Sequence, residues 1–125
     1  MPRSITAALC ALLLVAGAGC GQSDQEKARE TVQDYVDARN SKDFEAECDL
    51  YTEEFLKQIG ATDCPAFVKE QTSGAATGDL KLVSVRVKDD RGTAELDVSG
   101  ESGASTRVGL TLERQDGEWK VSGLQ

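Results

Sequence analysis

The amino-acid sequence predicts an α+β fold in which N-terminal helices pack on a curved, four-stranded antiparallel meander sheet. Two observations support this prediction. Between residues 25 and 71 the apolar residues recur every three or four positions, which is the spacing of one face of a helix. From residue 80 onward they alternate with polar residues in short segments separated by turns. A block of helices followed by a block of strands is typical of α+β domains.

The first predicted helix covers residues 25–39. Ser23 and Glu26 form an S-x-x-E capping box, which signals a helix start. The polar segment 40–43 is expected to end the helix. The apolar side chains of this helix share one face: Ala28, Val32, Tyr35 and Val36.

Three shorter helices are expected next. The first of them places three side chains on one face: Phe44, Cys48 and Tyr51. The second spans residues 53–59, with Thr52 as its N-cap and Gly60 at its end. The third begins at Cys64 and is capped by Asp63.

The predicted strands follow a small polar loop at residues 72–78. The parity of the apolar residues changes between Leu82 and Val83, which predicts a β-bulge that bends the first strand. Turns are expected at residues 89–92, 100–103 and 115–118. In the first of these turns we expect Gly92 to take the left-handed backbone conformation.

Each predicted strand has one apolar and one polar face, so the helices need to cover only one side of the sheet. The helical half also contains most of the aromatic residues. A bent sheet that closes on these helices forms a cone that can enclose a cavity. The candidate cavity-lining residues are Tyr35, Tyr51, Phe55 and Trp119.

The N-terminal segment has the composition of a secretory signal. Arg3 precedes an apolar run that ends in small residues, and this run is too short for a membrane span. Ala18-Gly19-Cys20 resembles a bacterial lipobox, whose cysteine becomes the lipid-bearing first residue of the mature protein. The alternative is an ordinary secretory signal cut near Ala18, with Cys20 left as a free thiol. The predicted division is a signal peptide at 1–19, a lipidated tether at 20–24 and a single domain at 25–125.

Two cysteines remain for the folded domain, because Cys10 falls in the signal and Cys20 is the expected lipid site. In an oxidising, extracytoplasmic location we expect Cys48 and Cys64 to form a disulfide; two free buried thiols are the alternative. The chain has no histidine, and two thiolates are too few for a closed zinc site. No metal or cofactor is therefore expected.

The formal net charge of −8 narrows the possible partners. Nucleic-acid binding uses basic patches, and attachment to anionic lipid uses clustered Lys and Arg, so neither is expected. We expect membrane contact on the extracytoplasmic face of a bacterial cell membrane, through the lipid on Cys20. The short tether is expected to keep the domain and its ligand near that surface. The expected oligomeric state is a monomer or a homodimer.

Three segments resemble the nuclear transport factor two-like (cystatin-like) superfamily: residues 32–43 its opening helix, 48–55 its second helix and 116–124 its closing strand. The resemblance implies a cone-shaped α+β fold. It also implies how an enzyme of this superfamily, such as an isomerase or a cyclase, would work: with an acid/base pair inside the cone. The residues that can supply such a pair are Tyr35 or Tyr51 with one of the acids Asp34, Glu47 and Asp49.

Because the chain lacks histidine and any recognisable catalytic set, the sequence favours a non-catalytic function. We expect a membrane-anchored lipoprotein that binds a small apolar ligand or a cell-envelope partner protein. Two alternatives stay open. One is a structural or assembly module that dimerises or docks through its sheet. The other is an isomerase- or cyclase-like enzyme that uses the carboxylate and tyrosine groups named above.

Overall fold

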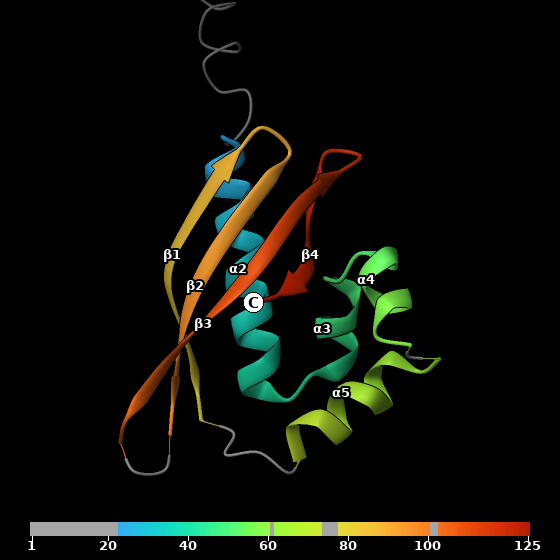
Figure 1. The fold of residues 1–125 in the computed structure, drawn as a ribbon, viewed down its shortest axis with the longest axis vertical. Helices are drawn as coiled ribbons and strands as arrows, with labels where there is room; N and C mark the ends of the chain where they lie inside the picture. The colour runs from blue at the N-terminus through green and yellow to red at the C-terminus, as the bar shows by residue number, and fades with distance from the viewer. Residues whose placement is uncertain (1–22, 61, 74–77, 101–102) are drawn as a thin grey trace, which may run out of the picture.

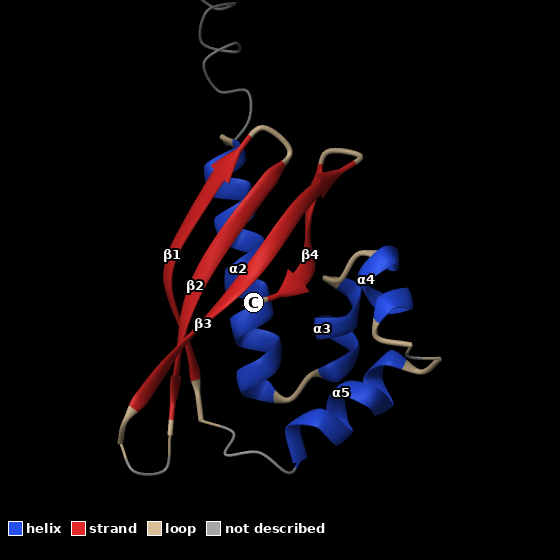
Figure 2. Cartoon of the chain, viewed as in Figure 1, coloured by secondary structure: helices blue, strands red, loops and turns tan. Residues whose placement is uncertain are grey.

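The computed structural model describes residues 23–60, 62–73, 78–100 and 103–125. The predicted signal peptide and the lipid site at Cys20 lie outside these residues, as do parts of the loops expected at 72–78 and 100–103. In the described part of the chain, helices precede strands (Figure 1, Figure 2), which confirms the α+β prediction. The bounds are α2 Asp24–Ser41, α3 Phe44–Asp49, α4 Glu53–Gln58, α5 Cys64–Ser73, β1 Leu80–Lys88, β2 Arg91–Ser99, β3 Ser105–Gln115 and β4 Glu118–Leu124.

The strands form one antiparallel meander sheet in the order β1-β2-β3-β4. The helix α2 runs along one face of this sheet, while α4 lies beside β4 and α5 packs on α3 (Figure 1). The register confirms the predicted bulge. Leu82 pairs with Leu96. The next pair is Ser84 with Glu95, so Val83 is an extra residue, and it is 38% exposed.

Side-chain caps and one left-handed residue set the helix ends. The Ser23 Oγ accepts a hydrogen bond from the Glu26 N–H at 3.2 Å, as the capping box predicts. The helix α2 runs past its predicted end at residue 39, because the polar segment continues the helix until Lys42 takes a left-handed conformation with φ 59°. At the start of α4, the Thr52 Oγ1 accepts a hydrogen bond from the Phe55 N–H at 3.1 Å.

The turn between β1 and β2 corrects one prediction. Asp89, and not Gly92, has the left-handed conformation, with φ 56°. Gly92 lies inside β2 and is buried; a Cβ there would stand 3.1 Å from the Val87 Cγ1, so packing rather than the turn favours glycine. The turn before β4 is as predicted, since Asp116 and Gly117 have φ values of 53° and 81°, the signs of a type I′ hairpin.

The core lies between α2 and the inner face of the sheet. Its fully buried aliphatic side chains come from both layers: Val32 of α2 with Leu96, Leu110, Leu112 and Val121 of the strands. The link between α3 and α4 joins this core by pairing with β4. The Thr52 N–H donates to the Val121 carbonyl at 3.0 Å, and the Val121 N–H donates to the Leu50 carbonyl at 2.7 Å.

Cys48 of α3 and Cys64, the first residue of α5, form a disulfide with their Cα atoms 6.0 Å apart. This confirms the predicted pairing over the alternative of two free thiols. The helix α5 packs on α3 and buries Val68. The disulfide therefore fixes α5 to α3.

Candidate functional site

Two depressions in the described part of the chain have the size of a small-molecule site. The first, here called the outer groove, has a volume of about 560 Å³ and lies between α4 and the outer face of the sheet. Exposed cations contribute to its lining: Arg86, Lys88 and Arg91. The second, here called the inner cavity, has a volume of about 330 Å³. It lies where the C-terminal ends of α2 and α5 meet the sheet.

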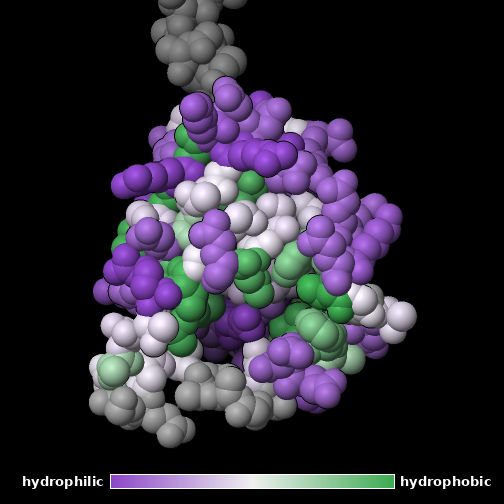
Figure 3. All heavy atoms as spheres, viewed as in Figure 1, coloured by the Kyte–Doolittle hydropathy of each residue, from purple (hydrophilic) through white to green (hydrophobic). Residues whose placement is uncertain are grey.

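The inner cavity is the better candidate for a ligand site, because its walls are apolar side chains of the inner face of the cone. Leu96 and Leu110 contribute buried walls, and the half-buried wall residues are Phe44, Leu80, Val98 and Val108. Figure 3 shows a recess in the lower part of the molecule, with hydrophobic residues on both sides of it. Polar groups enter the cavity from the last turns of α2, through Tyr35 and Arg39.

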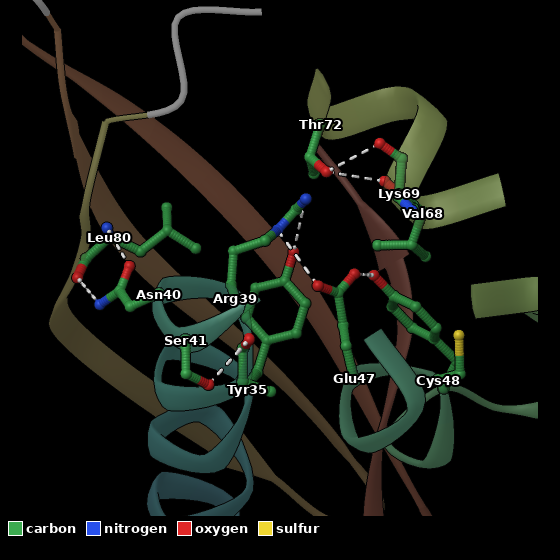
Figure 4. A network of polar contacts seen from close by, with 12 residues as sticks. Tyr35, Arg39, Asn40, Ser41, Glu47, Cys48, Val68, Lys69, Thr72 and Leu80 are labelled. Atoms are coloured by element: carbon green, nitrogen blue, oxygen red, sulfur yellow. Dashed lines mark hydrogen bonds and ion pairs between the residues drawn. The ribbon is translucent and has the colours of Figure 1, made fainter. Parts of the chain in front are cut away.

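A buried polar network connects the cavity to α3 (Figure 4). The Arg39 Nη2 donates to the Tyr35 Oη at 3.2 Å, and the Arg39 Nε lies 3.3 Å from the Glu47 Oε1. The Tyr51 Oη donates to the Glu47 Oε2 at 2.6 Å. The helical spacing explains the first contact, because side chains four residues apart share one face. The Tyr51–Glu47 contact likewise joins residues four apart, at the end of α3, and the Arg39–Glu47 ion pair connects α2 to α3.

The members of this network differ in burial. Glu47 is 1% exposed, Tyr35 2% and Tyr51 7%, whereas the Arg39 side chain is 26% exposed. The Arg39 Nε and the Glu47 Oε1 form an ion pair without a hydrogen bond. Arg39 lines the inner cavity and Glu47 does not. Arg39 therefore faces the cavity, with the carboxylate behind it.

Burial also changes the acidity of the network. Burial raises the pKa of Glu47, although the Tyr51 hydroxyl and the positive charge of Arg39 oppose the change. Burial raises the pKa of Tyr35 and that of Tyr51 as well. Both phenols are therefore neutral hydrogen-bond donors near pH 7. The network offers the cation of Arg39 to the cavity, held by a carboxyl group whose charged form is disfavoured by burial.

Asn40 defines a second edge of the inner cavity (Figure 4). Its Nδ2 donates to the Leu80 carbonyl at 2.9 Å, and its Oδ1 accepts from the Leu80 N–H at 2.8 Å. The side-chain amide thus pairs with the start of β1 as a neighbouring strand would. These two bonds hold the rim of the sheet against the end of α2.

The structure places the four predicted cavity-lining residues in different surroundings. Tyr35 lines the inner cavity and Phe55 lines the outer groove. Tyr51 and Trp119 are buried and line neither of these two depressions. Tyr51 is connected to the inner cavity only indirectly, through Glu47 and Arg39.

Of the acids considered as partners of the tyrosines, Glu47 is buried between them, whereas Asp34 and Asp49 are exposed. The sequence prediction missed Arg39. A signal was present, because Arg39 follows Tyr35 by one helical turn and so shares its face. Arginine on a helix of mixed polarity is commonly a solvated residue, which is why the pattern alone did not select it.

The outer face of the sheet is charged. Arg107 forms ion pairs with Asp97 at 2.6 Å and with Glu95 at 2.9 Å. Among the described residues, the large apolar side chains that are exposed are Val83 and Leu124. Stable dimer interfaces have an apolar centre, and these two side chains do not supply one. This surface therefore gives no support to a sheet-mediated dimer.

Neither a metal site nor a membrane span is found in the parts of the chain that the structure describes. No group of three or more His, Cys, Asp or Glu residues there could hold a metal ion. No helix there combines the length and the apolar character needed to cross a bilayer.

No protein-family model matches this chain, and no curated protein sequence matches it. Solved structures do resemble it. A SEC-C motif-containing protein from Rhodopseudomonas palustris has a TM-score of 0.58 and 18% identity, over 93% of this chain and 87% of that protein. An NTF2-like protein of unknown function from Burkholderia xenovorans has a TM-score of 0.56 and 18% identity, over 78% and 84%.

A third similar structure is an NTF2-like protein from Campylobacter jejuni, whose name proposes a transpeptidase activity for that protein. Its TM-score is 0.53 and its identity 15%, over 81% of this chain and 99% of that protein. Likenesses at such low identity concern the fold alone. The fold of this chain is NTF2-like, as the sequence resemblance implied.

Proposed function

We propose that this chain is an extracytoplasmic lipoprotein that holds a small, mainly apolar molecule in its inner cavity without converting it. The observation that carries the proposal is the cavity itself, which combines a volume of about 330 Å³ and apolar walls with converging polar groups from Tyr35 and Arg39. Sites for small molecules usually have this composition, with few polar groups that fix orientation.

The extracytoplasmic location is supported by two features that are independent of the cavity. The sequence Ala18-Gly19-Cys20 has the lipobox pattern. The disulfide between Cys48 and Cys64 is a bond found mainly in oxidising compartments. A lipid on Cys20 and a short polar tether would place the start of α2 close to the membrane.

The direction of α2 supports a cavity that opens away from the membrane. This helix of 18 residues is roughly 27 Å long. Its first residue, Asp24, lies at the β1–β2 turn, because Arg114 forms ion pairs with both Asp24 and Asp90. The cavity lies at the other end of the helix, because Tyr35, Arg39 and Asn40 line it. We therefore revise the expectation of a ligand at the membrane surface and propose one taken from the surrounding solution.

Binding of a neutral apolar molecule tests the proposal. The mature protein is placed in phosphatidylcholine nanodiscs and titrated calorimetrically with 1-octanol, with empty nanodiscs as the blank. Saturable binding at one site per chain is expected. No binding up to about 1 mM, which corresponds to a free energy of about −4 kcal/mol, would contradict the proposal.

A matched pair of substitutions locates the binding. Val98→Phe adds a ring to the wall of the inner cavity, whereas Val83→Phe adds the same ring at the exposed bulge. Octanol binding should weaken at least tenfold in the first variant and stay unchanged in the second. Equal binding in both variants would place the bound octanol outside the cavity.

The anchor is tested by the intact mass of the mature protein purified from its native membrane. The expected mass corresponds to a chain that begins at Cys20 and carries lipid, with two hydrogens lost to the Cys48–Cys64 disulfide. A chain that begins elsewhere, or a bare Cys20, would contradict the lipoprotein part of the proposal and leave the cavity part intact.

One observation favours a second candidate, a proton-transfer enzyme. Glu47 is buried beside both tyrosines, as the acid/base reading requires. Against it, the Glu47 carboxylate does not line the inner cavity. Native mass spectrometry separates the two candidates. A binding protein carries the same small molecule in wild type and in Glu47→Gln, whereas an enzyme accumulates unconverted substrate in the variant.

A further inference from the structure

The cavity of the proposed function holds a charged group whose donors are not all used. The Arg39 Nε faces Glu47 and its Nη2 donates to Tyr35. The Nη1 has no partner among the described residues, although it carries two N–H donors. With the Arg39 side chain 26% exposed and lining the inner cavity, these donors are available to a ligand.

The position of this guanidinium is fixed before any ligand arrives. Its Cζ lies 5.7 Å from the centre of the Tyr35 ring, and the Glu47 carboxylate holds its Nε edge. Glu47 is in turn held by the Tyr51 hydroxyl at 2.6 Å. A planar group fixed in this way loses little rotamer entropy when it binds a second anion.

Two features of the lining favour an anion. Lys42 lies at the end of α2 on the same cavity, and Asp79 is the one acid among the described lining residues. The lining residues therefore carry two cations, Arg39 and Lys42, against one acid. The opposite wall is apolar, with Val98, Val108 and Leu110. This arrangement suits a molecule with an anionic end and a hydrocarbon body.

We infer that the inner cavity binds a monocarboxylate with a short apolar body, and that Arg39 binds the carboxylate through its Nη1 edge. The inference rests on the proposed function and names its ligand class. Arginine is the residue best matched to a carboxylate, because its donors form a rigid fork. At about 30 Å³ for each water-sized group, a cavity of about 330 Å³ holds on the order of ten non-hydrogen atoms.

Octanoate, 1-octanol and octylamine have the same chain length and differ in the charge of the head group, so they test the inference. Each is titrated into the mature protein in phosphatidylcholine nanodiscs, with empty nanodiscs as the blank. Octanoate is expected to bind at least tenfold more tightly than octanol, and octylamine more weakly than octanol. Equal affinity for octanoate and octanol would overturn the carboxylate inference and leave the proposed function standing. No binding of any of the three would overturn both.

Two variants attribute the preference to Arg39. Arg39→Gln should remove the octanoate preference while octanol still binds. Because this change leaves Glu47 without its cation, a second variant, Arg39→Gln with Glu47→Gln, removes both members of the ion pair and leaves no unpaired carboxylate behind the cavity. The matched control is Arg86→Gln, an arginine of the outer groove, which should keep the full preference. An octanoate preference that survives in the double variant would overturn the role of Arg39.

Discussion

The ion pair between Arg39 and Glu47 should be energetically asymmetric, because its partners differ in exposure. Glu47 is 1% exposed, whereas the Arg39 side chain is 26% exposed. Arg39→Met leaves a buried carboxylate without its cation, and breaking a buried pair in this way typically costs about 3–5 kcal/mol of unfolding free energy. Glu47→Gln leaves a cation that already contacts solvent, and the amide oxygen can still accept from Tyr51. We expect this second change to cost on the order of 1–2 kcal/mol.

The assay is urea unfolding followed by the fluorescence of Trp119, the one tryptophan of the chain, which is 4% exposed in the core. The ion pair also determines how the cost of Arg39→Met in unfolding free energy changes with pH. Loss of Arg39 removes a charge that lowers the pKa of Glu47, so Glu47 binds a proton more tightly in the native state of Arg39→Met. The cost of Arg39→Met should therefore shrink between pH 8 and pH 5. Equal costs for the two variants, or a cost independent of pH, would refute this reasoning.

Three further predictions concern stability. Reduction of the Cys48–Cys64 bond, with a sequence separation of 16, should lower the unfolding free energy by about 3 kcal/mol; urea curves with and without a phosphine reductant measure it, and an unchanged midpoint would contradict it. Thr52→Ala removes a buried N-cap and should cost about 1–2 kcal/mol, more than Asp43→Ala at an exposed cap; equal thermal shifts would count against this. Burial raises the pKa of Glu47 in the folded state. The contribution of this side chain to the unfolding free energy is therefore fully present below the pKa of the unfolded state. It is lost as the pH rises through the pKa of the folded state. Wild type should thus lose stability relative to Glu47→Gln between pH 5 and pH 8, by at most about 1.4 kcal/mol per pH unit, and a flat difference would contradict the assignment.

Local patterns in the sequence were sufficient to predict most of the fold. The capping box at Ser23 and the parity change at Val83 each depend on residues near in sequence, and both predictions are confirmed. The Asp-Gly turn at residues 116–117 belongs to the same class. These features follow from backbone and hydrogen-bond preferences that act over a few residues.

The predictions that failed depend on contacts across the fold. Gly92 looks like a turn residue in the sequence, but it lies inside β2, where the Arg86 carbonyl and the Val87 side chain of the neighbouring strand leave little room for a Cβ. Arg39 looks like a solvated helix residue until Glu47 of the next helix approaches it. No periodicity within one segment records such a pair, because the two side chains meet only when α2 and α3 pack together.

The cavity can be observed directly by nuclear magnetic resonance. Methyl-labelled mature protein in nanodiscs is titrated with octanoate, and the methyl signals are followed together with the Nε–H of Arg39. We expect saturable shifts at Leu96, Val98, Leu110 and the Arg39 Nε–H, with none at Val87 of the outer groove. Shifts centred on the outer groove, or no shift at Arg39 while octanoate binds, would contradict it.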